Sequence, residues 1–289
     1  MYTKYEEKTF EQYFNTELAE QTSVYFPLGQ VQESILGLDA VAYSESPSFF
    51  RLLGPLALSA KGTKLIDLAS HMETLLQKEI QGIPDIKVNL LFQYKRPEYI
   101  TRKSGAEWHL WNKKYFRYSL YEEQHNLLKE LESNFGEQAL VLYAAPAVVD
   151  VEELVNLKLN KAVIKYTNFR KASELNGHHR NTYIEAGTYS QACSDPQRLE
   201  NFDLLELIQQ QARELQVKEK RDNFLFVKKV AEASLENVSA FRNAYETRME
   251  DFRSLSEFEL FHSVITMSVF KEITGIQWIL ALSGRNKSA

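Results

Sequence analysis

The feature that most constrains this chain of 289 residues is the apolar run from Val88 to Lys95, which is closed by two polar side chains. The run is rich in strand formers, which makes it the strongest strand candidate in the chain. Gln93 and Lys95 are two residues apart, so they point to the same face of that strand. Pro97 follows closely and indicates that the sheet pairing ends there.

Further segments with the spacing of helices or strands precede and follow this run. They are an amphipathic helix at Thr9–Gln21, a strand at Ile35–Tyr43, a long insertion at Ser44–Gly82 with one helix near Lys64–Ile80, a strand or hairpin at Trp108–Leu120, a helix at Tyr121–Phe135 and a strand at Ala139–Ala145. The alternation of helices and strands predicts an α/β fold in which polar residues at strand ends form the site.

The chain changes character after Pro196. Before it, Lys161–Thr167 reads as a strand, and after it come three long helical patterns, at Leu199–Lys220, Asn223–Glu250 and Ser256–Leu282. We therefore expect an α/β domain over residues 1–196 and a helical domain over residues 197–289. The third pattern is apolar over most of its circumference, which predicts burial on several sides and a homo-oligomer or a stable protein partner.

Composition narrows the class of protein. Hydrophobic residues make up 44% of the chain and charged residues 25%, as in ordinary globular proteins. The single cysteine fits a reducing compartment, so we expect a cytoplasmic protein. The charged N-terminus does not resemble a signal or an anchor, and Lys271 and Glu272 interrupt the apolar stretch near the C-terminus, so no membrane contact is expected. No glycine-rich nucleotide-binding loop is present in the sequence.

The segment Gly37-Leu38-Asp39-Ala40 adds an acid that a neighbouring strand would carry to the same sheet edge as Gln93 and Lys95. This set resembles the PD-(D/E)xK nuclease superfamily, in its variant with Gln before the lysine. The resemblance implies a restriction-endonuclease-like mixed central sheet flanked by helices. It also implies that Asp39, Gln93 and the Tyr94 carbonyl hold Mg²⁺ or Mn²⁺ and that Lys95 acts at the reacting phosphate.

Other polar residues could complete such a site. Among upstream acids, Glu33 is the best placed, with Glu11 and Glu17 on the first helix as alternatives, and Gln124 at the start of the next helix could face the same cleft. Asp85-Ile86-Lys87 is a rival motif that opens the same strand and has a true carboxylate. Because Gln93 and Lys95 close the apolar run, where a strand would emerge into a cleft, we prefer them.

The region from Lys95 to Arg117 has more basic than acidic residues, although the whole chain has a net charge of −5. The basic residues that could neutralise phosphates are Arg96, Arg102, Lys103, Lys113, Lys114 and Arg117, interleaved with aromatic residues. The alternative is a solvated strand pair with the aromatic rings turned into the core.

The resemblance implies an endonuclease acting on DNA, and a role in restriction or anti-phage defence would suit proteins of that type. The competing hypothesis is an inactive nuclease-like scaffold or an interaction module that recruits a partner through its helical C-terminus. The two differ in whether Asp39, Gln93 and Lys95 approach one another within reach of one ion.

Overall fold

The computed structural model describes residues 3–27, 64–215 and 219–283. Strand β2 (Ile86–Tyr94) lies in the middle of a five-stranded mixed sheet with the order β1-β10-β2-β5-β6. Its neighbours are β10 (Ile276–Leu282), which is antiparallel to it, and β5 (Ala139–Pro146), which is parallel. Strands β1 (Val24–Tyr25) and β6 (Thr167–Lys171) form the edges. The strand predicted at Val88–Lys95 is confirmed, with the observed bounds Ile86–Tyr94.

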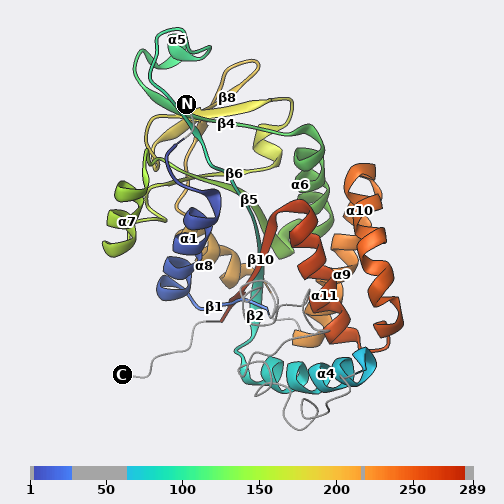
Figure 1. Cartoon of the computed structure of the whole chain (residues 1–289). Coiled ribbons are helices and arrows are strands. Elements are labelled where there is room, and N and C mark those ends of the chain that lie inside the picture. The colour runs from blue at the N-terminus through green and yellow to red at the C-terminus, as the bar shows by residue number, and fades with distance from the viewer. Residues whose placement is uncertain (1–2, 28–63, 216–218, 284–289) are drawn as a thin grey trace, which may run out of the picture.

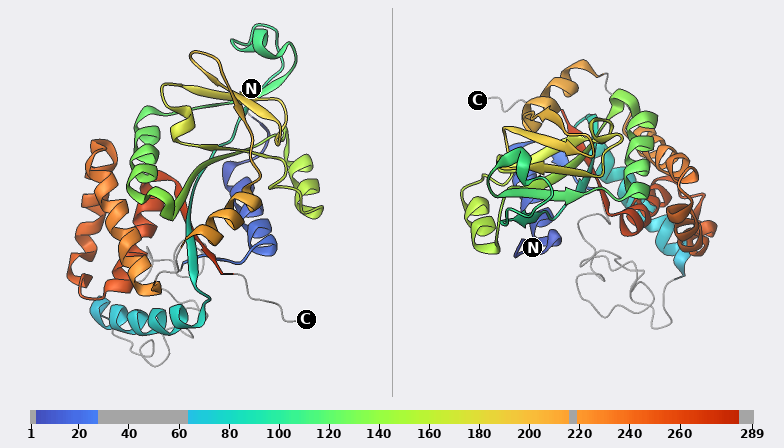
Figure 2. Two further views of the ribbon diagram at one scale, coloured as in Figure 1. Left: turned by 180° about the vertical axis from the view of Figure 1, so that it is seen from behind. Right: turned by 90° about the horizontal axis from the view of Figure 1, so that it is seen from above.

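Helices cover both faces of this central sheet (Figures 1 and 2). On one face lie α1 (Glu7–Gln21), α7 (Val151–Leu159) and α8 (Leu204–Glu214). On the other face lie α4 (Leu65–Gly82), α6 (Glu122–Phe135), α9 (Lys220–Glu236) and α11 (Glu259–Thr274). The alternating residues of β2 separate the two cores: Leu90 and Phe92 pack towards α1 and α8, whereas Leu91 packs with the second group.

A second, antiparallel sheet lies at one end of the central sheet and has the order β3-β4-β7-β8-β9. Its strands are β3 (Glu98–Ile100), β4 (Tyr115–Ser119), β7 (Arg180–Tyr183), β8 (Tyr189–Cys193) and β9 (Gln197–Glu200). The short helix α5 (Trp108–Trp111) lies in the connection between β3 and β4. The segment Trp108–Leu120 is therefore a helical turn followed by one strand.

The strand expected at Lys161–Thr167 is wrong, because the strand of that region, β6, begins at Thr167. Val163 and Ile164 before it are buried in a turn, where the Glu17 carboxylate accepts hydrogen bonds from their amides. The strand itself carries buried polar side chains. Arg170 donates to Ser190 and to the Leu199 and Glu200 carbonyls, and these bonds join the two sheets. The polar side chains of β6 are buried against partners that are distant in the sequence, so the hydrophobic pattern does not indicate a strand there.

The region after Pro196 is mainly helical, as predicted, but its elements differ from the three long helices expected. It begins with β9, and α9 ends at Glu236 before a separate α10 (Ser239–Met249), which continues into a 3-10 helix, η5 (Glu250–Leu255). The helix expected through Leu282 is wrong. Helix α11 ends at Thr274 because Gly275 adopts a φ of 73°, the left-handed conformation that terminates helices, and β10 follows.

This correction removes the reason for expecting a homo-oligomer. The apolar stripe of Ser256–Leu282 is shared between a helix and a strand, and both are buried within the same chain, against α4, α9, α10 and β2. The boundary expected near Asp195-Pro196 lies in the connection between β8 and β9, and the later residues add strands to both sheets. Among the described residues, no helix has both the length and the apolar character needed to cross a membrane.

Candidate functional site

Three of the predicted site residues meet at the carboxyl end of β2. Gln93 and Lys95 lie on the face that α6 covers, and their exposed fractions are only 4% and 7%. Gln124, in the first turn of α6, reaches both of them. Tyr94 lies between them on the strand and points to the opposite face, where its hydroxyl donates a hydrogen bond to Asn15 of α1 at 2.6 Å. The expected convergence of Gln93, Lys95 and Gln124 is thus observed.

A continuous chain of hydrogen bonds connects these side chains. Lys95 Nζ donates to Gln124 Oε1 at 2.5 Å, and Gln124 Nε2 donates to Gln93 Oε1 at 2.8 Å and to the Thr274 carbonyl at 3.0 Å. Gln93 Nε2 in turn donates to the Tyr94 carbonyl at 3.1 Å. Each amide therefore uses its oxygen and its nitrogen within the site, and Gln124 connects β2 to the end of α11.

Glu7 of α1 belongs to the same site, although sequence reasoning did not select it. It lines the hollow that contains Lys95, and its carboxylate accepts a hydrogen bond from the Arg96 amide at 3.0 Å. Burial raises the pKa of Glu7, and the positive charge of Lys95 partly opposes this shift. The sequence signals it only through its position one turn before Glu11, one of the alternative acids.

Burial makes the protonated form of Lys95 less favourable than it is in water. Burial lowers the pKa of Lys95 from 10.5 to about 8, and the negative charge of Glu7 counteracts the shift. Nζ lies 5.0 Å from the ring centroid of Tyr121 and 5.7 Å from that of Tyr143. Burying a cation costs stability. A lysine with a lowered pKa in a cleft is therefore a candidate functional residue.

The hollow has a volume of about 470 Å³ and opens where the central sheet meets the second sheet. Its walls include Glu7, Gln93, Lys95, Arg96, Arg117, Tyr121 and Gln124. Tyr121 stands at the mouth with 66% of its surface exposed. Glu6 and Glu98 also line the hollow and are paired with Arg96 and Arg117, so an anionic ligand would have to displace these carboxylates to reach the arginines.

The residues predicted to bind nucleic acid fall into two groups. Arg96 and Arg117 line the hollow, where Arg96 pairs with Glu6 at 3.2 Å and Arg117 pairs with Glu98 and with Glu107 at 2.5 and 3.2 Å. The other four are exposed in the segment between β3 and β4: Arg102, Lys103, Lys113 and Lys114.

The aromatic rings of the same segment favour the core interpretation. Trp111, Tyr115 and Phe116 are buried. Trp111 stacks on Tyr189, with centroids 5.2 Å apart, and its ring nitrogen donates to Thr182. These rings hold the segment on the second sheet and are not available as stacking faces for a ligand.

The remaining acidic candidates do not complete the site within the described part of the chain. Glu33 and Asp39 lie outside the described residues. Glu11 pairs with Lys271 at 3.1 Å, and Glu17 is occupied by backbone amides at the other end of α1. The rival motif, Asp85-Ile86-Lys87, lies at the opposite end of β2 from Gln124, and neither Asp85 nor Lys87 lines the hollow.

The donors present would suit a hard cation in their chemistry. The oxygen atoms at the end of β2 belong to the Gln93 amide, the Tyr94 carbonyl and, across the hollow, the Glu7 carboxylate, and Mg²⁺ and Mn²⁺ prefer such ligands. Two of these oxygens already accept hydrogen bonds from glutamine nitrogens. Within residues 3–27, 64–215 and 219–283, no group of three or more His, Cys, Asp or Glu side chains is arranged to hold a metal.

Comparisons of this chain with protein-family models, with curated proteins and with solved structures found no match. The fold and the site by themselves define a mixed α/β protein with a polar hollow around a buried lysine at the end of a strand.

Proposed function

We propose that the protein is a metal-dependent endonuclease that cleaves phosphodiester bonds in DNA. The observation that carries the proposal is the buried Lys95, which shares one strand face with Gln93 and meets Gln124 in a hollow lined by two arginines. A cation at this position can donate to a phosphoryl oxygen, and the arginines can orient the neighbouring phosphates.

The proposal assigns a task to three residues of the hollow, to the Tyr94 carbonyl and to two acids of the segment outside the described residues. Lys95, with a pKa of about 8, is mainly protonated at neutral pH and stabilises the charge that develops on the phosphate. Asp39, the Gln93 amide oxygen and the Tyr94 carbonyl would hold the metal, and Glu33 would assist. A bound Mg²⁺ or Mn²⁺ supplies Lewis-acid stabilisation and a more acidic water. Gln124 positions Lys95 and Gln93, to which it is hydrogen-bonded.

The test is cleavage of supercoiled plasmid by purified protein in Mg²⁺ and in Mn²⁺. Asp39→Ala and Lys95→Ala should each abolish cleavage, whereas Gln93→Glu should retain or raise it, because it restores a charged ligand. Asp85→Ala and Lys87→Ala are matched controls from the rival motif and should leave activity unchanged. Wild-type cleavage by a folded Asp39→Ala protein would refute the assignment.

A second candidate function is a nuclease-like module that binds without cutting. Gln93 favours it, because a neutral amide is a weaker ligand than a carboxylate and its oxygen is already occupied by Gln124. In this case the helical C-terminal region would recruit a partner protein. The two functions separate cleanly: DNA binding that depends on Lys95, without cleavage in either metal by the wild type or Gln93→Glu, identifies the binding module. A restriction or anti-phage role would follow only from the first.

A further inference from the structure

The amino group of Lys95 lines the hollow at the end of β2 with most of its hydrogen-bonding capacity unused. An ammonium group has three donors, and one of them is engaged, with Gln124 Oε1 at 2.5 Å. No carboxylate of the described residues forms an ion pair with Nζ. The residue is only 7% exposed. A buried amine with open donor positions therefore faces a space that a small molecule can enter.

The buried amine is also a nucleophile at neutral pH. Burial lowers the pKa of Lys95 to about 8, although the negative charge of Glu7 opposes the shift. Roughly a tenth of the amine is then neutral at pH 7, compared with less than about one part in a thousand for a lysine in water. The neutral form has the lone pair that attacks a carbonyl carbon, and desolvated lysines form Schiff bases with carbonyl compounds in this way.

The charges that line the hollow select an uncharged ligand. Three acidic and three basic side chains line it, so they balance one another. Arg96 is paired with Glu6 at 3.2 Å, and Arg117 is paired with Glu98 at 2.5 Å. An anion would have to displace these carboxylates, whereas an uncharged carbonyl compound leaves both pairs in place.

The ring of Tyr121 indicates that the ligand is flat. It is 66% exposed at the mouth of the hollow, and its centroid lies 5.0 Å from Lys95 Nζ. An aromatic ring joined to Nζ through one carbon atom comes within stacking reach of Tyr121, because offset aromatic pairs have centroids roughly 4.5–7 Å apart. The volume of about 470 Å³ is in the range of small-molecule sites.

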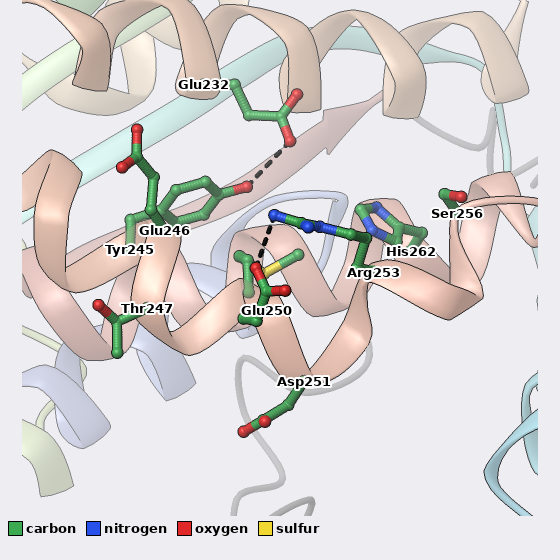
Figure 3. A pocket seen from close by; sticks show the side chains of 10 residues that line it. Glu232, Tyr245, Glu246, Thr247, Glu250, Asp251, Arg253, Ser256 and His262 are labelled. Carbon is green, nitrogen blue, oxygen red and sulfur yellow. Dashed lines mark hydrogen bonds and ion pairs between the residues drawn. The ribbon is translucent and has the colours of Figure 1, made fainter.

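A second hollow, among α9, α10, η5 and α11, offers no such amine (Figure 3). Its volume is about 740 Å³, and the described residues that line it include carboxylates, Arg253 and His262 but no lysine. The contacts drawn in Figure 3 are internal, from the Tyr245 hydroxyl to Glu232 at 2.9 Å and from Arg253 to Glu250 at 2.6 Å. Of these two hollows, only the one at β2 can bind a carbonyl compound covalently through an amine.

We propose that Lys95 forms a Schiff base with an uncharged aromatic aldehyde whose ring stacks on Tyr121. This activity goes beyond the proposed endonuclease: it uses the same lysine but needs neither a metal ion nor DNA. Gln124 holds Nζ at the wall of the hollow, so the amine is positioned before the aldehyde arrives.

The reaction is a condensation that releases one molecule of water. The neutral Nζ attacks the carbonyl carbon, a C–N bond forms, and a proton moves from nitrogen to the former carbonyl oxygen. The hydroxyl group then takes a proton from the Glu7 carboxyl group and leaves as water, while the nitrogen lone pair forms the C=N bond. Burial raises the pKa of Glu7, which makes its carboxyl group a suitable acid. The products are an iminium ion, the Glu7 carboxylate and water.

The test is reductive trapping on the full chain at pH 7 with benzaldehyde and sodium cyanoborohydride. Hydride adds to the C=N bond and fixes the label as a benzylated lysine, which peptide mass spectrometry locates and quantifies. Lys95 should be labelled about tenfold or more faster than the exposed Lys165, because roughly a tenth of the Lys95 amine is neutral at this pH. Equal labelling of the two lysines would overturn the proposal.

The contribution of the ring is tested by comparing benzaldehyde with acetaldehyde, which has no ring to stack. Tyr121→Ala should lower the ratio of the two labelling rates at Lys95 by roughly threefold to tenfold. Tyr166→Ala, at an exposed ring elsewhere, is the matched control and should leave the ratio unchanged. A ratio that Tyr121→Ala does not alter would mean a reactive lysine without a binding site, and would overturn the proposal.

The choice of an uncharged ligand is tested with para-carboxybenzaldehyde, which has the same ring and an added carboxylate. It should label Lys95 more slowly than benzaldehyde does, and faster labelling would contradict the proposal. Selective labelling of Lys95 in a protein that does not cleave DNA would support the Schiff-base site and remove only the endonuclease.

Discussion

Lys95 is a residue whose local environment opposes its charge. Its side chain is almost fully buried, and the groups that compensate it are a neutral amide, two aromatic rings and Glu7 across the hollow. A lysine that served only the fold would be replaced by an apolar side chain at a gain in stability. A residue that lowers the stability of the fold in this way is expected to serve binding or chemistry.

Lys95→Met should therefore stabilise the protein at neutral pH, by up to about 3 kcal/mol if the full pKa difference is expressed. In the wild type, folded Lys95 loses its proton near pH 8, whereas the unfolded chain keeps it until about pH 10.5. The unfolded state binds more protons in this window, so wild-type stability rises with pH there. The advantage of Lys95→Met should shrink between pH 8 and pH 10.5 in urea unfolding experiments. A constant difference across that range would contradict the lowered pKa.

At the scale of elements, the corner between α11 and β10 connects the helical layer to the site. Gly275 forms this corner with a φ of 73°, and a Cβ added to it would lie 3.6 Å from Gln93 Nε2, in ordinary contact. Backbone strain, rather than overlap, therefore sets the cost of a side chain here.

Gly275→Ala should destabilise the fold by about 1 kcal/mol, because the left-handed conformation is unfavourable for alanine. Gly82→Ala is the control: Gly82 ends α4 with open space around its Cα and an ordinary φ, so the substitution should be neutral or stabilising. Chemical denaturation of both variants measures the difference. Equal effects would mean that the corner is not conformationally constrained.

The segment between β3 and β4 carries exposed lysines, among them Lys113 and Lys114. If it binds DNA, reversing Lys113 and Lys114 to glutamate should weaken binding at low salt. The slope of log affinity against log salt should also fall, by roughly one for each phosphate that the protein no longer neutralises. Lys165→Glu, at an exposed lysine elsewhere, should change neither quantity. An unchanged slope in the double variant would identify the segment as a solvated surface.

At the scale of the whole molecule, the two ends of the chain meet in one sheet. Strand β10, near the C-terminus, lies between β1 and β2 and forms an extensive ladder with the latter. Helix α8 packs in the same core as α1, and β9 completes the second sheet. The C-terminal helices are thus preceded in the sequence by β9 and followed by β10, and each of these strands belongs to one of the two sheets.

A fragment of residues 1–196 should consequently fail to fold by itself. It would leave the β10 side of β2 unpaired and remove α8, α9 and α11 from both faces of the sheet. Far-UV circular dichroism and amide dispersion in NMR spectra test this, with the full chain as the reference. A cooperatively folding fragment would instead support an autonomous N-terminal domain with a boundary near Pro196.

The sequence by itself determined those features that depend on local pattern: the strand Val88–Lys95, the helices beginning near Thr9 and Tyr121, and the shared face of Gln93 and Lys95. Periodicity is a property of neighbouring residues, so it is visible without a fold. Only the tertiary structure decided that Glu7 lines the same hollow as Lys95 and that Ile276–Leu282 is a strand. Both faces of that strand are buried, so its continuous apolar pattern is the same as that of a buried helix. Its pairing with β2 is what makes the segment a strand.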